Sequence, residues 1–438
     1  MVLRQLGQWA DEELPRLNRA ILGGGAPPGL LAEEAREVLL PRLPEVGRLS
    51  EVQAQQLVVR LGFLGASVAR HYQEWTVGGK ATPERAFDGL VAGGQGMPFL
   101  QYFQALADRT GTGHCGRDSY ASLVRWNVGT LQVRRGEEIM AVLPGVFDDG
   151  RIRSYTSTDG EERFFLLVKQ GEAIELAVNE VLEPLARDGE GLISEDAVAR
   201  VRLAADLLDA LRNLFRDFAA RPPEQSMPAE QFLDVFRQFA VHWTADDIPP
   251  SGALDPEALK RDFLLGIAFG GYDQYVRRLF PVLLGAERAA LVRLMARPPL
   301  PRQMLASIGV DEADLRGAEL PDLSRLVGCH PGLADWHRLL TAHARASGAH
   351  LMLSKKFLFK PQQRRDAAGL GDRPLVSNRA GTTGMNEAFL ARLTRARQEH
   401  VLAPLRAAVN DERAENGTNA GVRLHPGAVA SVSVALVR

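Results

Sequence analysis

Apolar residues recur at helical spacing along most of this chain, which predicts a largely α-helical protein. Residues 28–72 carry Leu and Val at this spacing, with breaks at Pro41 and Pro44. Longer amphipathic patterns begin at Phe164, and a Pro-rich break separates them from the segment that ends at Trp243. The further predicted helices lie at 98–111, 120–129, 164–186, 195–220, 230–243, 262–296 with an interruption at Gly270–Gly271, 347–361 and 386–402.

Three polar or Gly-rich stretches interrupt this pattern. Residues 78–96 predict a loop, and residues 144–163, with their Asp-Gly turns, predict a small hairpin or an interdomain linker. Residues 411–438 predict a tail or a late strand. We therefore expect a small, mostly helical domain over 1–150, a large helical domain over 151–410 and a tail over 411–438.

Composition excludes several classes of protein. The chain has 438 residues, 45% hydrophobic and 24% charged, which is typical of a soluble globular protein. The formal net charge of −2 offers no basic field for nucleic acid. The two cysteines, Cys115 and Cys329, give neither a disulfide framework nor a zinc spacing. We expect a cytoplasmic protein, since the sequence contains no signal peptide and no apolar run of about 18 residues. We expect it to be a monomer or a homodimer.

Two histidines on one predicted helix are candidate metal ligands. His350 lies in SGAHLMLSKKFLFKP among small residues, which would let a flat macrocycle approach the backbone. His343 lies two turns earlier on the same face, and spacing alone does not choose between them. The alternative is that both are ordinary histidines of a helix.

Arg237 is a candidate anion-binding residue. It lies off the apolar stripe of its helix, yet its helical neighbours include Leu233, Ala240 and Val241. A guanidinium in such a setting either extends to the surface, for example to pair with Asp234, or binds a carboxylate in a buried site.

A short turn of small residues, Ala380-Gly-Thr-Thr-Gly384, precedes the last predicted helix. Its glycines let the backbone approach a ligand, and its hydroxyls can form hydrogen bonds. The alternative is an ordinary helix N-terminus with a Thr cap. The polar, Gly-containing stretch 361–379 before it is typical of a mobile lid.

The order of these segments, over roughly residues 90–405, resembles the indoleamine 2,3-dioxygenase family. The resemblance implies an all-α, indoleamine 2,3-dioxygenase-like fold whose large domain binds haem b, with His350 as the proximal ligand of the iron. It implies that Arg237 binds the substrate's carboxylate and that Phe232 packs against the indole. It places Phe164 and Val168 on the distal wall, where Val168 replaces a common Ser. It assigns Gly381, Thr382 and Thr383 to the turn that closes over the substrate.

One departure from the family concerns the haem propionates. Animal members pair an Asp just before a VLLG run with an Arg three residues before the haem histidine; this chain has Pro281 and Ser347 there. Propionate anchoring must therefore differ, and besides Ser347 the candidates are Arg345, Lys355 and Lys356.

The resemblance implies a haem-dependent dioxygenase that opens the indole 2,3-bond of tryptophan or a related amino acid with O2 and gives an N-formylkynurenine-type product. Such an enzyme needs an electron donor that keeps the iron ferrous. One alternative is a relative of monodechloroaminopyrrolnitrin synthase, which rearranges chlorotryptophan. The other is a non-catalytic O2-binding haem protein, which would have no carboxylate for Arg237 to bind.

Overall fold

Helices make up most of the computed structural model, which describes residues 2–112, 116–188, 191–369, 374–419 and 432–437. The helices at the amino-terminal end are α1 (Val2–Gln8), α2 (Leu14–Leu22), α3 (Leu30–Glu34), α4 (Glu51–Trp75) and α5 (Phe99–Thr110). The long helices that follow are α6 (Asp159–Asp188), α7 (Glu195–Ala220), α14 (Gly332–Ser354) and α16 (Glu387–Gln398). The shorter ones are α8 (Pro256–Leu264), α9 (Tyr272–Leu279), α10 (Gly285–Met295), α11 (Leu300–Ser307), α12 (Glu312–Gly317), α13 (Leu320–Cys329), α15 (Lys360–Ala367) and α17 (Arg406–Asn419).

Side-chain caps fix where several of these helices begin. Ser50 caps α4 through a capping box in which its hydroxyl accepts from the Gln53 amide while Gln53 accepts from the Ser50 amide. Asp255 accepts two backbone N–H groups at the start of α8, and Asn386 accepts the Phe389 N–H at the start of α16. Helix α16 is thus capped by Asn386 rather than by a threonine of the turn before it.

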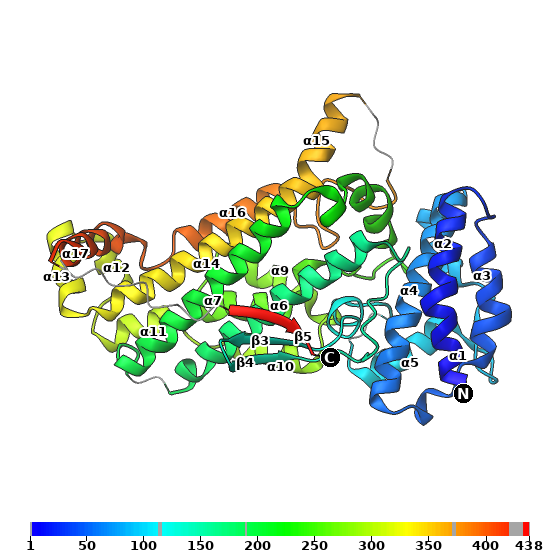
Figure 1. Ribbon diagram of the computed structural model, residues 1–438, viewed down its shortest axis with the longest axis horizontal. Helices are drawn as coiled ribbons and strands as arrows, with labels where there is room; N and C mark the ends of the chain where they lie inside the picture. Colours follow the sequence, from blue (N-terminus) through cyan, green and yellow to red (C-terminus); the bar gives the residue numbers. More distant parts are fainter. Residues whose placement is uncertain (1, 113–115, 189–190, 370–373, 420–431, 438) are drawn as a thin grey trace.

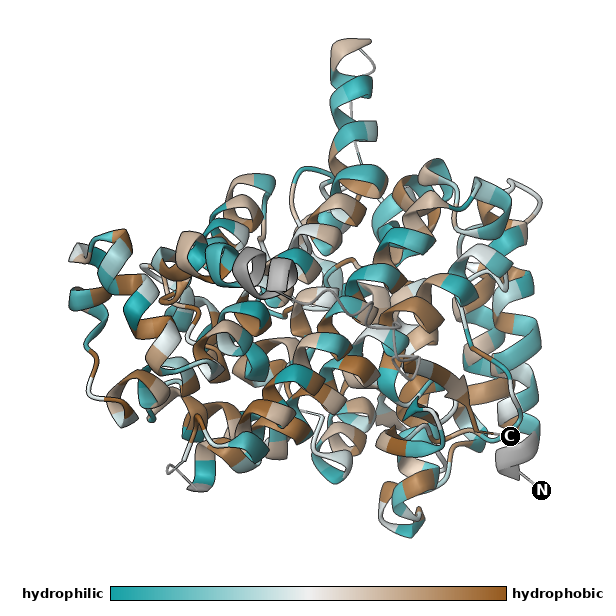
Figure 2. Cartoon of the chain, turned by 60° about the vertical axis from the view of Figure 1, so that its left-hand side comes forward, coloured by the Kyte–Doolittle hydropathy of each residue, from teal (hydrophilic) through white to brown (hydrophobic). Residues whose placement is uncertain are grey.

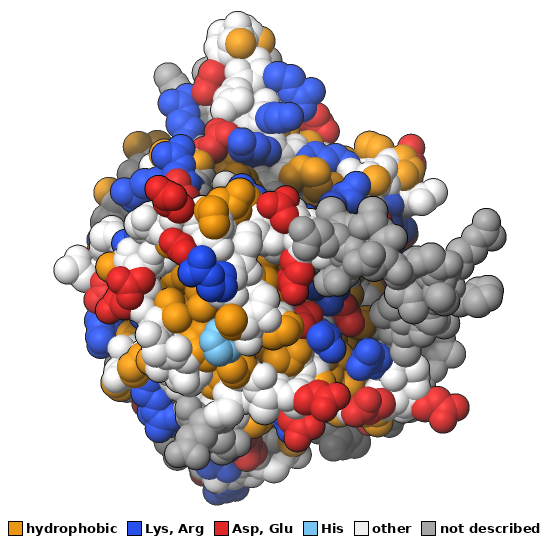
Figure 3. Space-filling view, turned by 90° about the vertical axis from the view of Figure 1, so that its left-hand side faces the viewer, with side chains coloured by type: hydrophobic (Ala, Val, Ile, Leu, Met, Phe, Trp, Pro, Cys, Tyr) orange, Lys and Arg blue, Asp and Glu red, His pale blue; other side chains and the backbone are white. Residues whose placement is uncertain are grey.

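The elements form an elongated arrangement (Figure 1). Helices α1–α5 lie at one end, and α12, α13 and α17 lie at the other. Between them run α6, α7, α14 and α16, while α15 projects away from the body. Apolar and polar residues alternate along the helices throughout the chain (Figure 2). Figure 3 shows the end opposite α1–α5, where apolar side chains gather and charged side chains surround them.

Short strands accompany the helices, and the described residues contain five of them. Strand β1 (Val91–Ala92), in the predicted loop 78–96, pairs with β2 (Met97–Pro98), which directly follows that loop. The second sheet has the order β4-β3-β5, all antiparallel, built from β3 (Leu131–Arg135), β4 (Glu138–Leu143) and β5 (Val432–Leu436). The late strand expected near the carboxyl end is therefore present in β5.

Three local predictions need correction. The predicted helix 120–129 is limited to one turn, Ala121–Arg125. Beyond this turn the Lys169 ammonium donates hydrogen bonds to the carbonyls of Arg125, Val128 and Gly129. The predicted helix 230–243 ends at Phe239, and the Trp243 N–H donates to the Asp247 carboxylate instead of continuing the helix. Residues 411–419, predicted as tail, continue α17, and residues 420–431 lie outside the described residues.

Two large hydrophobic clusters form the core. One joins the amino-terminal helices to later residues such as Tyr275 and Leu393, so it includes residues on both sides of position 150. The other joins α6, α7 and α14 to the inner face of the β4-β3-β5 sheet. Cys329 is exposed and free, and Cys115 lies outside the described residues. No helix in the described residues combines the length and the apolar character that crossing a bilayer requires.

Candidate functional site

A cavity of about 220 Å³ lies among α6, α7, α8, α14 and α16, and the ring of His350 faces it. By its accessible surface His350 is exposed, and it also lines this cavity, where protein atoms surround it closely. The Phe215 ring lies beside it, with 5.8 Å between the ring centroids. Burial, assisted by the charges of Arg397 and Arg261, lowers the pKa of His350 to about 4. The imidazole is therefore neutral at pH 7, which is the form that ligates metals.

His343, the competing histidine, does not line the cavity. Its Nε2 lies 3.0 Å from Asp262 Oδ1, and both side chains are fully buried. Burial lowers the pKa of His343 to about 3, against the opposing effect of Asp262. The structure thus separates the two histidines, because His343 contacts α8 while His350 faces the cavity.

The wall opposite α14 is apolar. Helix α6 contributes Phe164, Leu167, Val168 and Gly171 to it. A Cβ added at Gly171 would lie 3.2 Å from Phe215 Cζ, so the absence of a side chain there keeps space between α6 and α7. The apolar residues of α6 and the neutral His350 imidazole are the groups that would hold a haem here.

A second, aromatic cavity of about 140 Å³ adjoins the first. The two share four wall residues, Phe164, Val168, Phe232 and Gly252. Arg237 and Thr382 complete its wall, together with Tyr120, Tyr155, Phe165 and Phe236 among others. Five of the residues that the sequence assigns to substrate therefore come together here: Phe164, Val168, Phe232, Arg237 and Thr382.

Arg237 is 8% exposed and has no carboxylate partner among the described residues. Its Nη2 donates to the carbonyls of Ser377, at 2.6 Å, and of Ala380. Burial lowers the pKa of Arg237 to about 10. The alternative pairing with Asp234 does not occur, since that carboxylate accepts two hydrogen bonds of 2.7 Å from Arg365.

The 380–384 turn is held by its own backbone. The Gly381 N–H donates to the Met385 carbonyl at 2.7 Å, and Gly384 adopts a φ of 85°. The Thr382 hydroxyl donates to the Pro250 carbonyl at 2.9 Å, and the Thr383 hydroxyl accepts from Tyr275 at 2.8 Å. Of the three predicted turn residues, Thr382 lines the aromatic cavity, while Gly381 lines an outer hollow on the far side of Arg237. Thr383 lines neither.

The predicted cofactor-binding residues divide into two groups. Ser347 lines the first cavity. Arg345 is exposed, Lys355 lies 3.4 Å from Glu387, and Lys356 donates to the Ala219 carbonyl, so none of these three lines the cavity. For Arg345 and Lys355 the reason is helical geometry, since a residue five positions from His350 is rotated by about 140° around the helix axis.

Sequence reasoning missed the charged end of the cavity. Arg261, Asp262 and Arg397 line it, from α8 and α16. Arg397 Nε donates to Asp262 Oδ1 at 3.0 Å, its Nη2 donates to Oδ2 at 2.6 Å, and its Nη1 donates to the Ser347 hydroxyl. The sequence signal for this end was the presence of Ser347 and Pro281 where the resemblance implies an Arg and an Asp.

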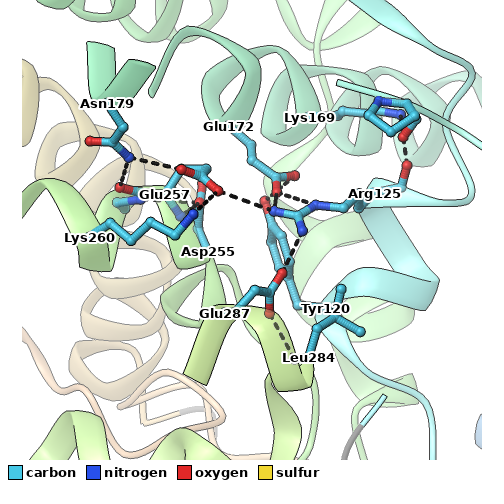
Figure 4. Close-up of polar contacts among 12 residues, drawn as sticks. Tyr120, Arg125, Lys169, Glu172, Asn179, Asp255, Glu257, Lys260, Leu284 and Glu287 are labelled. Carbon is cyan, nitrogen blue, oxygen red and sulfur yellow. Dashed lines mark hydrogen bonds and ion pairs between the residues drawn. The ribbon is translucent and has the colours of Figure 1, made fainter. Parts of the chain in front are cut away.

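A second charged cluster lies next to this end, around Arg125 (Figure 4). Glu172, Glu257 and Glu287 point toward the Arg125 guanidinium, with Lys260 and Asn179 behind Glu257. Asp255 belongs to both regions. It lines the cavity, and as the cap of α8 it accepts the N–H of Glu257, a member of the Arg125 cluster. Burial and the charges of Glu175 and Glu172 raise the pKa of Asp255 well above its usual range.

No protein-family model matches the chain, and a search of curated proteins gives no significant match. Within the described residues there is no group of three or more His, Cys, Asp or Glu side chains that would hold a metal ion by themselves.

Proposed function

We propose that the protein is a haem-dependent dioxygenase that acts on tryptophan or a related indole amino acid. The observation that carries this proposal is the adjacency of two cavities, one with the neutral His350 imidazole and one with the buried Arg237 guanidinium. The fit to haem rests on the accessible ring of His350 and on the apolar wall that faces it. When bound, the haem supplies the oxygen chemistry.

The chain's own residues bind, orient and exclude water. Phe164 and Phe232, whose ring centroids lie 5.3 Å apart, border both cavities and offer flat apolar surface to an indole ring. Arg237 has the charge and the planar fork that suit the amino acid's carboxylate. Val168, in place of a hydroxyl residue, contributes no hydrogen-bonding side chain to the shared wall.

The test is haem binding by the purified protein, followed by its Soret absorption. His350→Ala is expected to lose haem affinity by about 100-fold or more, because the one axial ligand is removed. His343→Gln is the matched control on the same helix and is expected to keep the spectrum of the original protein. A His350→Ala variant with an unchanged spectrum would refute the assignment.

Product analysis then tests the reaction. Reduced, haem-loaded protein with L-tryptophan and O2 is expected to give an N-formylkynurenine-type product, detected by mass spectrometry. A rearranged product from 7-chlorotryptophan alone would indicate the monodechloroaminopyrrolnitrin synthase-like alternative. Reversible O2 binding without product from either substrate would indicate an O2-binding protein.

A further inference from the structure

The charged end of the His350 cavity contains two guanidinium groups with unused donors. Arginine has five N–H groups. Arg397 uses three of them, two on Asp262 and one on Ser347, so each of its Nη atoms keeps one N–H. Arg261 is 3% exposed, and its Nε has no hydrogen-bond partner within the described part of the chain.

The neighbouring carboxylates do not satisfy these donors. Asp262 Oδ1 is approached by Arg397 and by His343, and its Oδ2 accepts from Arg397 and from the Tyr272 hydroxyl at 2.5 Å. Its acceptor positions are therefore filled, and its role is to hold Arg397. Glu175 Oε1 lies 2.7 Å from Arg261 Nη1, which leaves the Arg261 Nε unpaired.

A buried N–H without an acceptor is unfavourable by itself, so the N–H groups that Arg397 keeps on the cavity wall suit a ligand that brings acceptor oxygens. The Arg261 Nε is not accessible from the cavity, so Arg261 contributes its positive charge rather than a direct contact. Carboxylates are the matching groups, because charge-assisted bonds to guanidinium are the strongest that arginine forms. Asp255 and Glu175 also line this end, and burial raises the pKa of Asp255 well above its usual range, which favours the neutral form of that carboxyl group.

We infer that Arg397, assisted by Arg261, binds the propionate carboxylates of the haem, an inference that rests on the proposed function. The guanidinium comes from α16 and lies against Ser347, three residues before His350. It thereby takes over the position for which the resemblance implies an arginine of the histidine's own helix, and Asp262 of α8 takes over the role of the acid that Pro281 replaces.

The test compares haem with haem dimethyl ester, in which both propionates lose their charge. Dissociation constants are measured by Soret titration for the original protein, Arg397→Met, Arg261→Met and the control Arg395→Met, an exposed position of α16 outside the cavity. The original protein is expected to bind haem about tenfold or more tightly than the ester. Arg397→Met is expected to weaken haem binding by about 10- to 100-fold and ester binding by less than about threefold.

Arg261→Met is expected to show the same selectivity with a smaller effect, and Arg395→Met none. Equal weakening of haem and ester in Arg397→Met would overturn the inference. If Arg397→Met does not fold, Arg397→Lys keeps the charge but loses the two-point contact with Asp262, and it must still bind haem less tightly without affecting the ester. An original protein that binds neither porphyrin refutes the proposed function itself; one that binds both equally refutes only the propionate assignment.

Discussion

Arg125, which is partly buried, and Arg261, which is fully buried, lie in neighbouring regions, but their surroundings differ. Arg125 is surrounded by three carboxylates, those of Glu172, Glu257 and Glu287 (Figure 4). Each of these is held by a second partner: Glu172 by Tyr120, Glu257 by Lys260, and Glu287 by the Leu284 amide. Arg261 has one carboxylate within ion-pair distance, that of Glu175, while Asp262 and Asp255 act on it through their charges, and its Nε has no acceptor in the described residues.

The difference separates a structural cluster from a binding surface. A guanidinium whose charge is balanced by several buried acids has no capacity left for a ligand. A guanidinium on a cavity wall with N–H groups that lack an acceptor is destabilising, because those groups are removed from water without a hydrogen bond in return. A ligand that accepts these hydrogen bonds removes that cost. The same criterion applies to Arg237, which bonds only to backbone carbonyls and lines the aromatic cavity.

The largest effect is expected from Arg125→Met. The substitution leaves three buried carboxylates without their common cation, so the free energy of unfolding should fall by about 3–5 kcal/mol. Urea unfolding of the haem-free protein measures this. Arg163→Met removes an ion pair with the exposed Asp159 and serves as the control, with an expected loss of about 0–1 kcal/mol. A loss for Arg125→Met no larger than that of the control would remove the distinction between the two regions.

An intermediate effect is expected from Arg237→Met. Hydrogen bonds to a charged group contribute about 1.5–3 kcal/mol, so the dissociation constant for L-tryptophan should rise by about 10- to 100-fold. Binding of indole, which lacks the carboxylate, should change little. Calorimetric titration of the haem-loaded protein with both ligands measures the contrast, and equal weakening of the two would exclude Arg237 from the carboxylate site.

The smallest effect is expected from pH. A proton and the iron compete for the same lone pair of His350, and the lowered pKa of about 4 means that the proton competes only in acid. Haem affinity should therefore stay constant within about twofold from pH 8 to pH 5 and weaken as the pH falls through about 4. An accessible histidine with its ordinary pKa of about 6.5 would instead weaken binding about tenfold per unit below that value. Soret titrations at several pH values, with circular dichroism to check folding, distinguish the two.

The sequence predicted the helices well because their apolar periodicity is a local property. It could not choose between His343 and His350, since both lie on one face of α14, and only the position of Asp262 on another helix separates them. The meeting of Asp262, Ser347 and Arg397 depends on how α8, α14 and α16 pack, which no spacing within one segment encodes.

Other errors were avoidable in principle. Arg345 and Lys355 are each five positions from His350, so the period of a helix already turns them away from the face that His350 occupies. The helix predicted through Gly129 ended early for a reason that sequence does not reveal. Lys169, from α6, forms hydrogen bonds with carbonyls that a continued helix would have used internally.

The hydrogen bonds from Arg237 to the Ser377 and Ala380 carbonyls hold the segment that precedes α16 in place. A carboxylate that forms a two-point contact with the guanidinium needs Nη2, whose N–H groups already donate to these two carbonyls, so it must compete with them. Part of its interaction energy is then offset by loosening that segment, so affinity and the order of residues 374–380 are thermodynamically linked. Ligands without a carboxylate should leave these hydrogen bonds intact and bind without disturbing residues 374–380. Acidic ligands should loosen these residues when they bind.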